Sequence, residues 1–343
     1  MVRLRGQDRL SVTVGTMTGK RTSGRGVAWP TRLHVVTGKG GTGKTTVAAA
    51  LALALARDGG RVLLVEVEGR QGIAQLFGLQ PLPYQERRVA ATGDGGEVRA
   101  LAVDAEEALL EYLELFYKLG MAVRALRKIG AVDFATTIAP GLRDVLLTGK
   151  VKEAVTRTAD GRRVYDAVVL DAPPTGRIGR FLNVTAETAR LAKVGPIKTQ
   201  SEGVAAILRS PMTSVHVVTL LEEMPVQESS DAMAELTGLG IPIGRVIVNG
   251  TRPPALAGAK ITGAEVRRAL TAVGLPADRE TVAGLVVEGR AHQTRLEVES
   301  ELRTTLDGLG RPIIELPALA GGVTRDGLDR IADLLHDGLS QPL

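Results

Sequence analysis

Short runs of Val, Ile and Leu alternate along the chain with longer stretches in which apolar residues recur at helical spacing. The runs lie at residues 33–37, 61–67, 97–103, 164–170, 214–220, 244–249 and 311–315. Short runs rich in these residues are typical of strands buried on both faces, and their alternation with helices is typical of parallel strands. The pattern therefore predicts an α/β fold with a doubly wound, mainly parallel sheet. The segments 80–97 and 250–262 are rich in Pro, Gly and charge, and we expect them to be loops.

The stretch 104–155 interrupts this rhythm and predicts a helical subdomain inserted into the sheet domain. Asp104 followed by Glu107 is typical of a helix start. Apolar residues from Leu109 to Val123 then fall on one helical face. Two interpretations stay open. The stripe is either a helical layer packed on the sheet, or an apolar surface that opens and closes and holds an apolar client.

The composition excludes several classes of protein. With 343 residues, of which 44% are hydrophobic, the chain is long enough for one large core or for one domain with a sizeable insertion. No apolar run is long enough for a transmembrane helix, and residues 1–30 lack the apolar segment of a secretory signal, so we expect a cytoplasmic protein. Cysteine is absent, which excludes disulfides, thiolate metal sites and cysteine nucleophiles.

The net charge of +5 is concentrated at the N-terminus. Residues 1–30 hold six Lys or Arg residues against Asp8 alone, so they carry +5 and the remaining residues are balanced. Because this segment is also rich in Ser, Thr and Gly, we expect a disordered basic tail, followed by one domain over residues 31–343. No aromatic residue interleaves the charges before Trp29, which disfavours a nucleic-acid partner.

The glycine-rich segment 38–46 predicts a phosphate-binding loop. It reads Gly-Lys-Gly-Gly-Thr-Gly-Lys-Thr-Thr and fits the pattern G-x-x-x-x-G-K-[ST]. Glycine accepts backbone angles that a side chain would forbid, so successive N–H groups can turn inward and cradle phosphate oxygens. The flanking apolar runs and the Ala- and Leu-rich segment 45–56 supply the strand, loop, helix and strand that the pattern requires. The expected ATP contacts of this loop are Gly38, Lys39, Gly40, Gly41, Thr42, Gly43, Lys44, Thr45 and Thr46.

Three side chains of the loop have expected roles in catalysis. Lys44 can reach the β- and γ-phosphates, and the helix that begins there turns its positive dipole end toward them. The Thr45 hydroxyl can hold the Mg²⁺ that accompanies ATP. A second lysine, Lys39, follows the first glycine directly, and it indicates that two subunits cooperate in hydrolysis.

A carboxylate and a rigid turn follow the apolar run 164–170. Asp171 ends this strand, and after a phosphate loop such a residue is expected near Mg²⁺, through a water. The turn after it contains Pro174, Thr175 and Gly176. Its backbone N–H groups could sense the γ-phosphate, and loss of that phosphate on hydrolysis would release the segment. We therefore interpret this turn as a nucleotide-sensitive switch.

Two further strand ends complete the predicted site. Glu66 and Glu68 follow the second apolar run, and one of them is expected to orient the attacking water. Glu68, nearer the loop, is the candidate. Asn249 ends the run 244–249, and its amide can read both a donor and an acceptor on the edge of adenine. No N-K-x-D sequence for guanine occurs, so ATP is favoured over GTP.

Together these motifs resemble the family of arsenite-pump ATPase subunits and tail-anchored-protein-targeting ATPases, which are P-loop NTPases of the deviant Walker A class. The resemblance covers residues 32–338 and looks closest to the paired actinobacterial members. It implies a dimer, homotypic or with a paralogous ATPase, in which Lys39 reaches the partner's phosphates. It also implies a membrane-protein client, held by the helical subdomain, or a membrane transport partner that brings the protein to the membrane. The adenine-packing loop of the family would map to Leu316 and Pro317.

Three departures from the family pattern affect these expectations. Glu68-Gly69 stands where the family usually has Asp-Pro, and Arg177 stands where it usually has His. The absence of cysteine excludes a thiolate arsenite site and an interfacial zinc site, so Mg²⁺ with ATP is the expected cofactor and zinc is not. The chain has one phosphate loop, so a second subunit must supply the other site.

Two other functions stay open. A partitioning or division-positioning ATPase shares the Lys39-type loop, but it would need a basic amphipathic C-terminal helix or a basic DNA-binding face. Residues 323–339 instead carry four Asp against two Arg. A weakly hydrolysing partner subunit of a heterodimer also fits, because Glu68 replaces the aspartate of the family. The lack of cysteine excludes the cluster of a nitrogenase-type iron protein.

Overall fold

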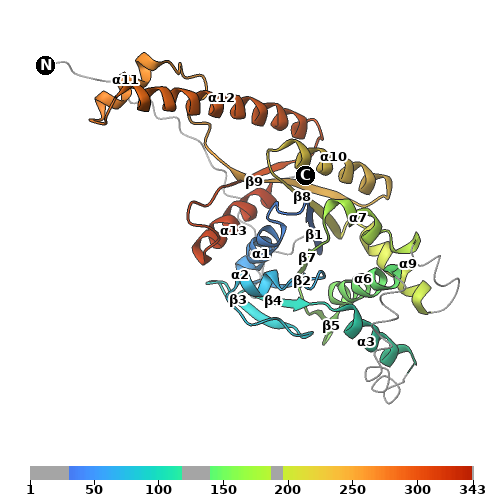
Figure 1. The fold of residues 1–343 in the computed structure, drawn as a ribbon. Coiled ribbons are helices and arrows are strands. Elements are labelled where there is room, and N and C mark those ends of the chain that lie inside the picture. The colour runs from blue at the N-terminus through green and yellow to red at the C-terminus, as the bar shows by residue number, and fades with distance from the viewer. Residues whose placement is uncertain (1–30, 118–139, 187–195, 342–343) are drawn as a thin grey trace, which may run out of the picture.

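An eight-stranded sheet forms the centre of the structure (Figure 1). The computed structural model describes residues 31–117, 140–186 and 196–341. The strand order is β10-β9-β8-β1-β7-β2-β4-β3, and all neighbours are parallel except β3 and β4. The strands are β1 Leu33–Gly38, β2 Arg61–Glu66, β3 Arg87–Ala91, β4 Glu97–Ala102, β7 Ala167–Asp171, β8 Thr213–Thr219, β9 Ile243–Thr251 and β10 Ile313–Pro317. This arrangement confirms the predicted α/β fold with a mainly parallel sheet.

Helices cover both faces of the sheet and give the molecule three layers. One apolar core lies between the sheet and α1 (Lys44–Ala56), α2 (Gly72–Leu76) and α13 (Arg325–Ser340). The other core joins the opposite face to α3 (Ala105–Tyr117), α6 (Pro140–Thr156), α7 (Thr175–Leu182), α9 (Pro196–Leu208) and α10 (Glu223–Gly238). Because side chains alternate across a strand, Val35 enters the second core and Val36 the first.

The helix α1 is buried on nearly all sides. It packs between the sheet and α13, and its sequence after Thr46 consists of Val, Ala and Leu alone. A helix that is apolar all round needs such a doubly covered position. Its N-terminus is thereby fixed at the carboxyl end of β1, in the middle of the sheet.

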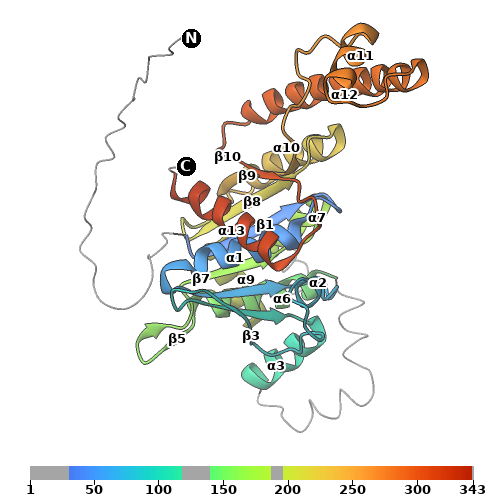
Figure 2. The same cartoon turned by 90° about the vertical axis from the view of Figure 1, so that its left-hand side faces the viewer.

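A helical arm projects from this body (Figures 1 and 2). It consists of α11 (Gly263–Ala272) and the 29-residue α12 (Arg279–Asp307), which begins after an N-cap aspartate, Asp278. Within α12 the buried residues are Val282, Gly289 and Leu306. The helix is therefore mostly solvent-exposed. Its apolar residues do not form a stripe from which the helix could have been predicted.

The expectation of a loop over 80–97 is wrong in part. Residues 87–91 form β3, an antiparallel edge strand whose pairing with β4 is interrupted by a bulge between Arg88 and Ala90. Edge strands can carry charged side chains because solvent covers one side, so this segment lacks an apolar run. In the segment 250–262, β9 continues to Thr251 and the rest contains no helix or strand. The remaining short elements are η1 (Arg57–Gly59) and the hairpin of β5 (Thr158–Ala159) and β6 (Arg162–Arg163).

Two predicted segments fall wholly or partly outside the described residues. These are the basic tail, 1–30, and the middle of the helical insertion, 118–139. The described part of the insertion consists of α3 and α6, and Asp104 caps α3 by accepting hydrogen bonds from the backbone N–H groups of Glu106 and Glu107. Leu109 and Tyr112 of the predicted stripe are buried in the core. In this part of the chain the stripe is a packed layer.

Candidate nucleotide site

The glycine-rich loop lies between β1 and α1, and close packing explains two of its glycines. A Cβ atom on Gly38 would lie 2.1 Å from the backbone oxygen of Val218 in β8. Gly43 has a φ of +88°, which disfavours any other residue, and a Cβ there would lie 2.4 Å from Nδ2 of Asn249. The loop therefore needs glycine at both positions to fit against the ends of β8 and β9.

Lys44, Thr45 and Asp171 meet where this loop enters α1. Asp171 ends β7 next to Val36 of β1, and its Oδ2 accepts a 2.7 Å hydrogen bond from the Thr45 hydroxyl. Lys44 Nζ points back to the Lys39 carbonyl oxygen, at 3.5 Å. Burial lowers the pKa of Lys44, and the charges of Asp171 and Glu68 oppose this effect. The sequence-predicted residues of the phosphate and metal site thus come together.

The oxygens of Thr45 and Asp171 fit a Mg²⁺ ion. Asp171 Oδ1 is buried without a hydrogen-bond partner, and burial raises the pKa of this carboxyl to about 6, so the site favours a cation that would compensate its charge. Across the described ranges no group of three or more His, Asp or Glu residues could hold a metal by itself. Mg²⁺ bound with a nucleotide usually takes only one or two protein ligands and fills the rest with water and phosphate.

The two candidate carboxylates after β2 have different surroundings. Glu66 is buried, and its Oε1 accepts a 3.0 Å hydrogen bond from the backbone N–H of Gly72 at the start of α2. Glu68 lies 3.6 Å from Arg177 and 3.7 Å from Arg70. Glu68 and Arg177 line a cavity of about 200 Å³ together with Pro173 of the turn after Asp171. Glu66 is thus engaged in the fold, and Glu68 is the carboxylate that faces an open space.

The turn after Asp171 is held to two neighbouring elements. The Thr37 hydroxyl of β1 donates to the Pro173 carbonyl oxygen at 2.7 Å. Pro174 is the N-cap of α7, which begins at Thr175, and a Cβ on Gly176 would meet no atom within 4 Å. The Thr175 hydroxyl donates to Glu228 of α10 at 3.0 Å.

Glu228 also binds the loop and was missed by sequence reasoning. Its Oε1 lies 2.7 Å from Lys39 Nζ, while its Oε2 accepts the hydrogen bond from Thr175. The pKa of Glu228 is lowered, chiefly by the hydrogen bond with Lys39. A single Glu among the four acidic residues of α10 gives no signal in the sequence, because only the packing of α10 on α7 brings it to the loop.

Asn249 lines a cavity of about 660 Å³. Three segments line this cavity: Leu220 to Glu222 after β8, Asn249 to Arg252 at the end of β9, and one side of α12 from Ala291 to Glu299. Asn249 Nδ2 donates to the Thr42 carbonyl oxygen at 2.9 Å, which leaves the amide oxygen and one hydrogen for a ligand.

The two residues predicted to pack on adenine do not line this cavity. Leu316 pairs with Asn249 across β10 and β9, but its side chain has no exposed surface and lies in the core. Pro317 follows it and is half-buried. An adenine contact at these positions stays a prediction, and only Pro317 has a side chain near the surface.

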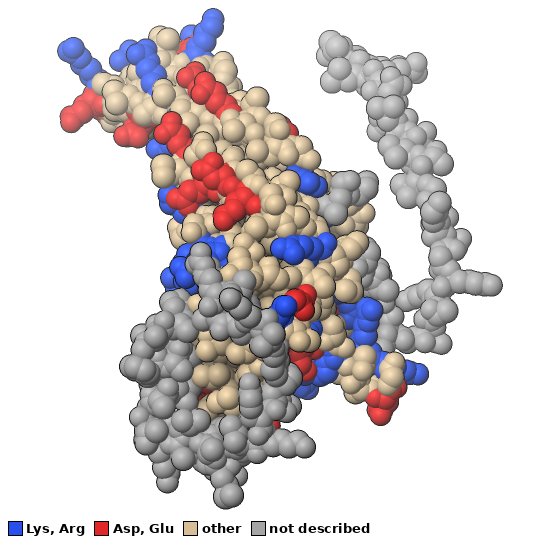
Figure 3. Space-filling view, turned by 90° about the vertical axis from the view of Figure 1, so that its right-hand side faces the viewer, with Lys and Arg blue, Asp and Glu red and all other residues tan. Residues whose placement is uncertain are grey.

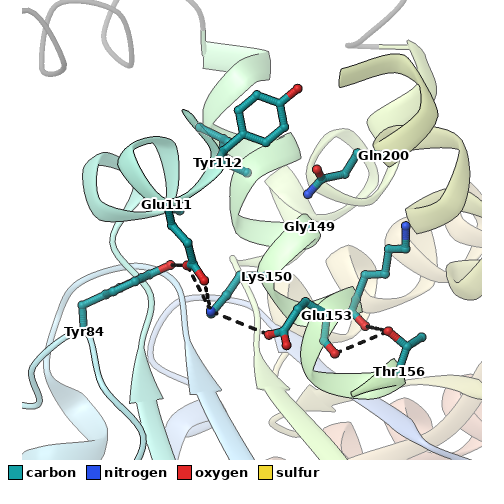
Figure 4. A pocket seen from close by; sticks show the side chains of 11 residues that line it. Tyr84, Glu111, Tyr112, Gly149, Lys150, Glu153, Thr156 and Gln200 are labelled. Atoms are coloured by element: carbon teal, nitrogen blue, oxygen red, sulfur yellow. Dashed lines mark hydrogen bonds and ion pairs between the residues drawn. The ribbon is translucent and has the colours of Figure 1, made fainter. Parts of the chain in front are cut away.

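A second cavity, of about 300 Å³, lies among α3, α6 and α9 (Figure 4). Lys150 of α6 projects between Glu111, at 2.7 Å, and Glu153, at 3.7 Å. The Tyr84 hydroxyl donates to Glu111 at 2.6 Å. Burial is the main cause of the raised pKa of Tyr84, and this hydrogen bond raises it further. The side chains of Tyr84, Glu111 and Lys150 therefore satisfy one another.

The outer surface carries both signs of charge. Acidic and basic side chains are interspersed on the face drawn in Figure 3. In the described part of the chain, no helix combines the length and apolar character needed to cross a membrane.

Comparisons with known proteins agree with this geometry. A family model described as anion-transporting ATPase matches residues 31–201. ATPase BagA of Mycobacterium tuberculosis is 53% identical over 326 residues, which cover 91% of this chain and 96% of that protein. An arsenical pump-driving ATPase of Escherichia coli is 25% identical over 275 residues, or 73% of this chain and 44% of that protein. ATPase GET3B of Arabidopsis thaliana is 25% identical over 271 residues, which cover 65% of each protein.

Proposed function

Because the chain belongs to the anion-transporting ATPase family, we propose that it is an ATP-driven switch in which two chains close on bound nucleotide. It is an ATPase, as its family is, and the pair of Thr45 and Asp171 beside Lys44 supports this function most directly. A hydroxyl, a carboxylate with an unpartnered buried oxygen and a desolvated ammonium are the groups that a metal-bound triphosphate requires. They lie at the positive end of a buried helix, which favours phosphate further.

Each group at this site would have a separate task in hydrolysis. When bound with ATP, Mg²⁺ neutralises charge on the β- and γ-phosphates, and Thr45 and Asp171 would hold it. Lys44 would leave the Lys39 carbonyl and contact the phosphates. Glu68 would orient the attacking water, since Glu66 is engaged in capping α2. Such positioning accounts for most of catalysis in phosphoryl transfer.

The cavity beside Asn249 would hold the nucleoside. Its lining residue Asn249 contacts Thr42 of the loop, and its volume of about 660 Å³ lies in the ordinary range for small-molecule sites. The free amide oxygen and the second amide hydrogen of Asn249 match the amine and ring nitrogen of adenine. In this proposal α12 forms a wall of the nucleoside site, through Val298 and Arg295. The arm is thereby linked to the bound nucleotide.

We further propose that ATP turnover drives an apolar client or a membrane partner. Relatives named as arsenical pump-driving ATPases support coupling to transport, but a chain without cysteine cannot bind arsenite through thiolates. The helix α6 lines both the cavity beside Glu68 and the cavity of Lys150, so one rigid element spans the switch and the helical layer. A change at the switch could therefore alter the helical layer.

The test is capture of partners by a chain that retains ATP. Glu68→Gln should bind ATP without turning it over, and Lys44→Ala, which should lose ATP binding, is the matched control. We expect a paralogous ATPase, or membrane proteins with apolar segments, to co-purify with Glu68→Gln in ATP and not with Lys44→Ala. Recovery of chromosomal or division proteins, or of the chain alone, would contradict the proposal. Unchanged turnover by Lys44→Ala would contradict the assignment of the nucleotide site itself.

A further inference from the structure

Glu228 joins two parts of the site that come from distant places in the sequence. One oxygen lies 2.7 Å from Nζ of Lys39 in the loop, and the other accepts a 3.0 Å hydrogen bond from Thr175 at the start of α7. All three residues belong to one chain. We infer that Glu228 is a positioning residue that restrains Lys39 within its own subunit and competes with nucleotide phosphate for it.

The inference follows from the chemistry of the ammonium group, and it rests on the proposed function. Lys39 can serve a nucleotide held by another chain only if its Nζ turns toward that nucleotide. A carboxylate and a phosphate are both anionic acceptors, so they compete for the same cation. Lys39 and Glu228 are about one-third exposed, at 31% and 33%, so their pair is weak enough to break.

The second oxygen of Glu228 links this restraint to the switch. Thr175 follows Pro174 directly and begins α7, which packs against α10. If the turn after Asp171 moves with the γ-phosphate, the hydrogen bond from Thr175 moves with it, and Glu228 loses one of its two anchors. Lys39 is either held by Glu228 or released. A nucleotide that binds the released state more tightly would shift this equilibrium toward release.

The variant Glu228→Gln tests the inference in the full chain. The amide keeps the shape of the side chain and removes its charge. We expect this variant to form active dimers more readily, so the protein concentration that gives half-maximal ATP turnover should fall. The expected fall is about threefold for each freed lysine, or about tenfold for a dimer with two of them. Asp231→Asn is the control, because it removes a charge from the exposed face of the same helix, where Asp231 contacts Gln227.

A measurement without ATP separates this inference from the proposed function. Modification of lysines by an acylating reagent, read by mass spectrometry, should label Lys39 several times faster in Glu228→Gln than in the wild type or in Asp231→Asn. Faster labelling in a chain that does not hydrolyse ATP would support the restraint and contradict the proposed function. Unchanged labelling, or turnover by Glu228→Gln that needs a higher protein concentration, would overturn the inference.

Discussion

Two histidines buried between β1 and β8 should make the stability of this fold sensitive to acid. The rings of His34 and His216 stack with their centroids 5.3 Å apart, and their facing nitrogens are separated by 3.1 Å. His216 Nδ1 accepts from the backbone N–H of Arg245, at 3.3 Å. His216 must therefore carry its proton on Nε2, and this N–H donates a hydrogen bond to Nδ1 of His34. Both rings are then neutral. Burial lowers the pKa of His34 to about 4 and the pKa of His216 well below its usual value.

The direction of the effect follows from which state binds the proton. An unfolded histidine has a pKa of about 6.5, so between about pH 6.5 and 4 the unfolded chain binds protons that the folded pair rejects. The folded state therefore has its full free energy of unfolding above about pH 6.5 and loses part of it as the pH falls. For His34 alone, a shift from 6.5 to about 4 corresponds to a loss of about 2 kcal/mol at pH 5. The lowered pKa of His216 acts in the same direction.

Urea unfolding followed by circular dichroism at pH 7.5, 6 and 5 measures this loss. The matched variant is His34→Leu with His216→Leu, which removes both titrating groups and leaves every carboxylate in place. We expect the free energy of unfolding to fall by at least about 2 kcal/mol more in the wild type than in the double variant between pH 7.5 and 5. Equal falls in the two proteins would refute the reasoning, whatever their absolute stabilities.

Three further changes test the nucleotide site. Gly43→Ala should weaken ATP binding at least tenfold by calorimetry, because positive φ costs about 1–2 kcal/mol and the new methyl displaces Asn249; unchanged affinity would contradict this. Glu66→Gln should lower the free energy of unfolding by about 1 kcal/mol while turnover per folded molecule persists, and lost turnover would make Glu66 catalytic. Val298→Trp should weaken ATP binding about tenfold but leave inorganic triphosphate binding unchanged, since it fills the nucleoside cavity.

The sequence was most informative where the site is contiguous or lies at strand ends. The loop, Asp171 and Asn249 could be predicted because parallel strands bring their carboxyl ends to one edge of a sheet. Glu228 could not, since it reaches Lys39 only through the packing of α10. The wall formed by α12 was missed because a mostly exposed helix has no apolar stripe. The resemblance places Leu316 at the adenine, and the sequence alone did not show that its side chain is buried in the core.

The most direct test of a two-chain ATPase uses two variants of opposite kind. Lys39→Ala keeps its own phosphate-binding lysine but has no lysine to offer a partner, while Lys44→Ala has the reverse defect. Each should hydrolyse ATP at less than about one-tenth of the wild-type rate alone. In an equal mixture half of the dimers are mixed, and each has one complete site, so turnover should recover to about a quarter of the wild-type rate. A mixture no more active than its separate components would contradict the cross-subunit role of Lys39 in a dimer of this chain.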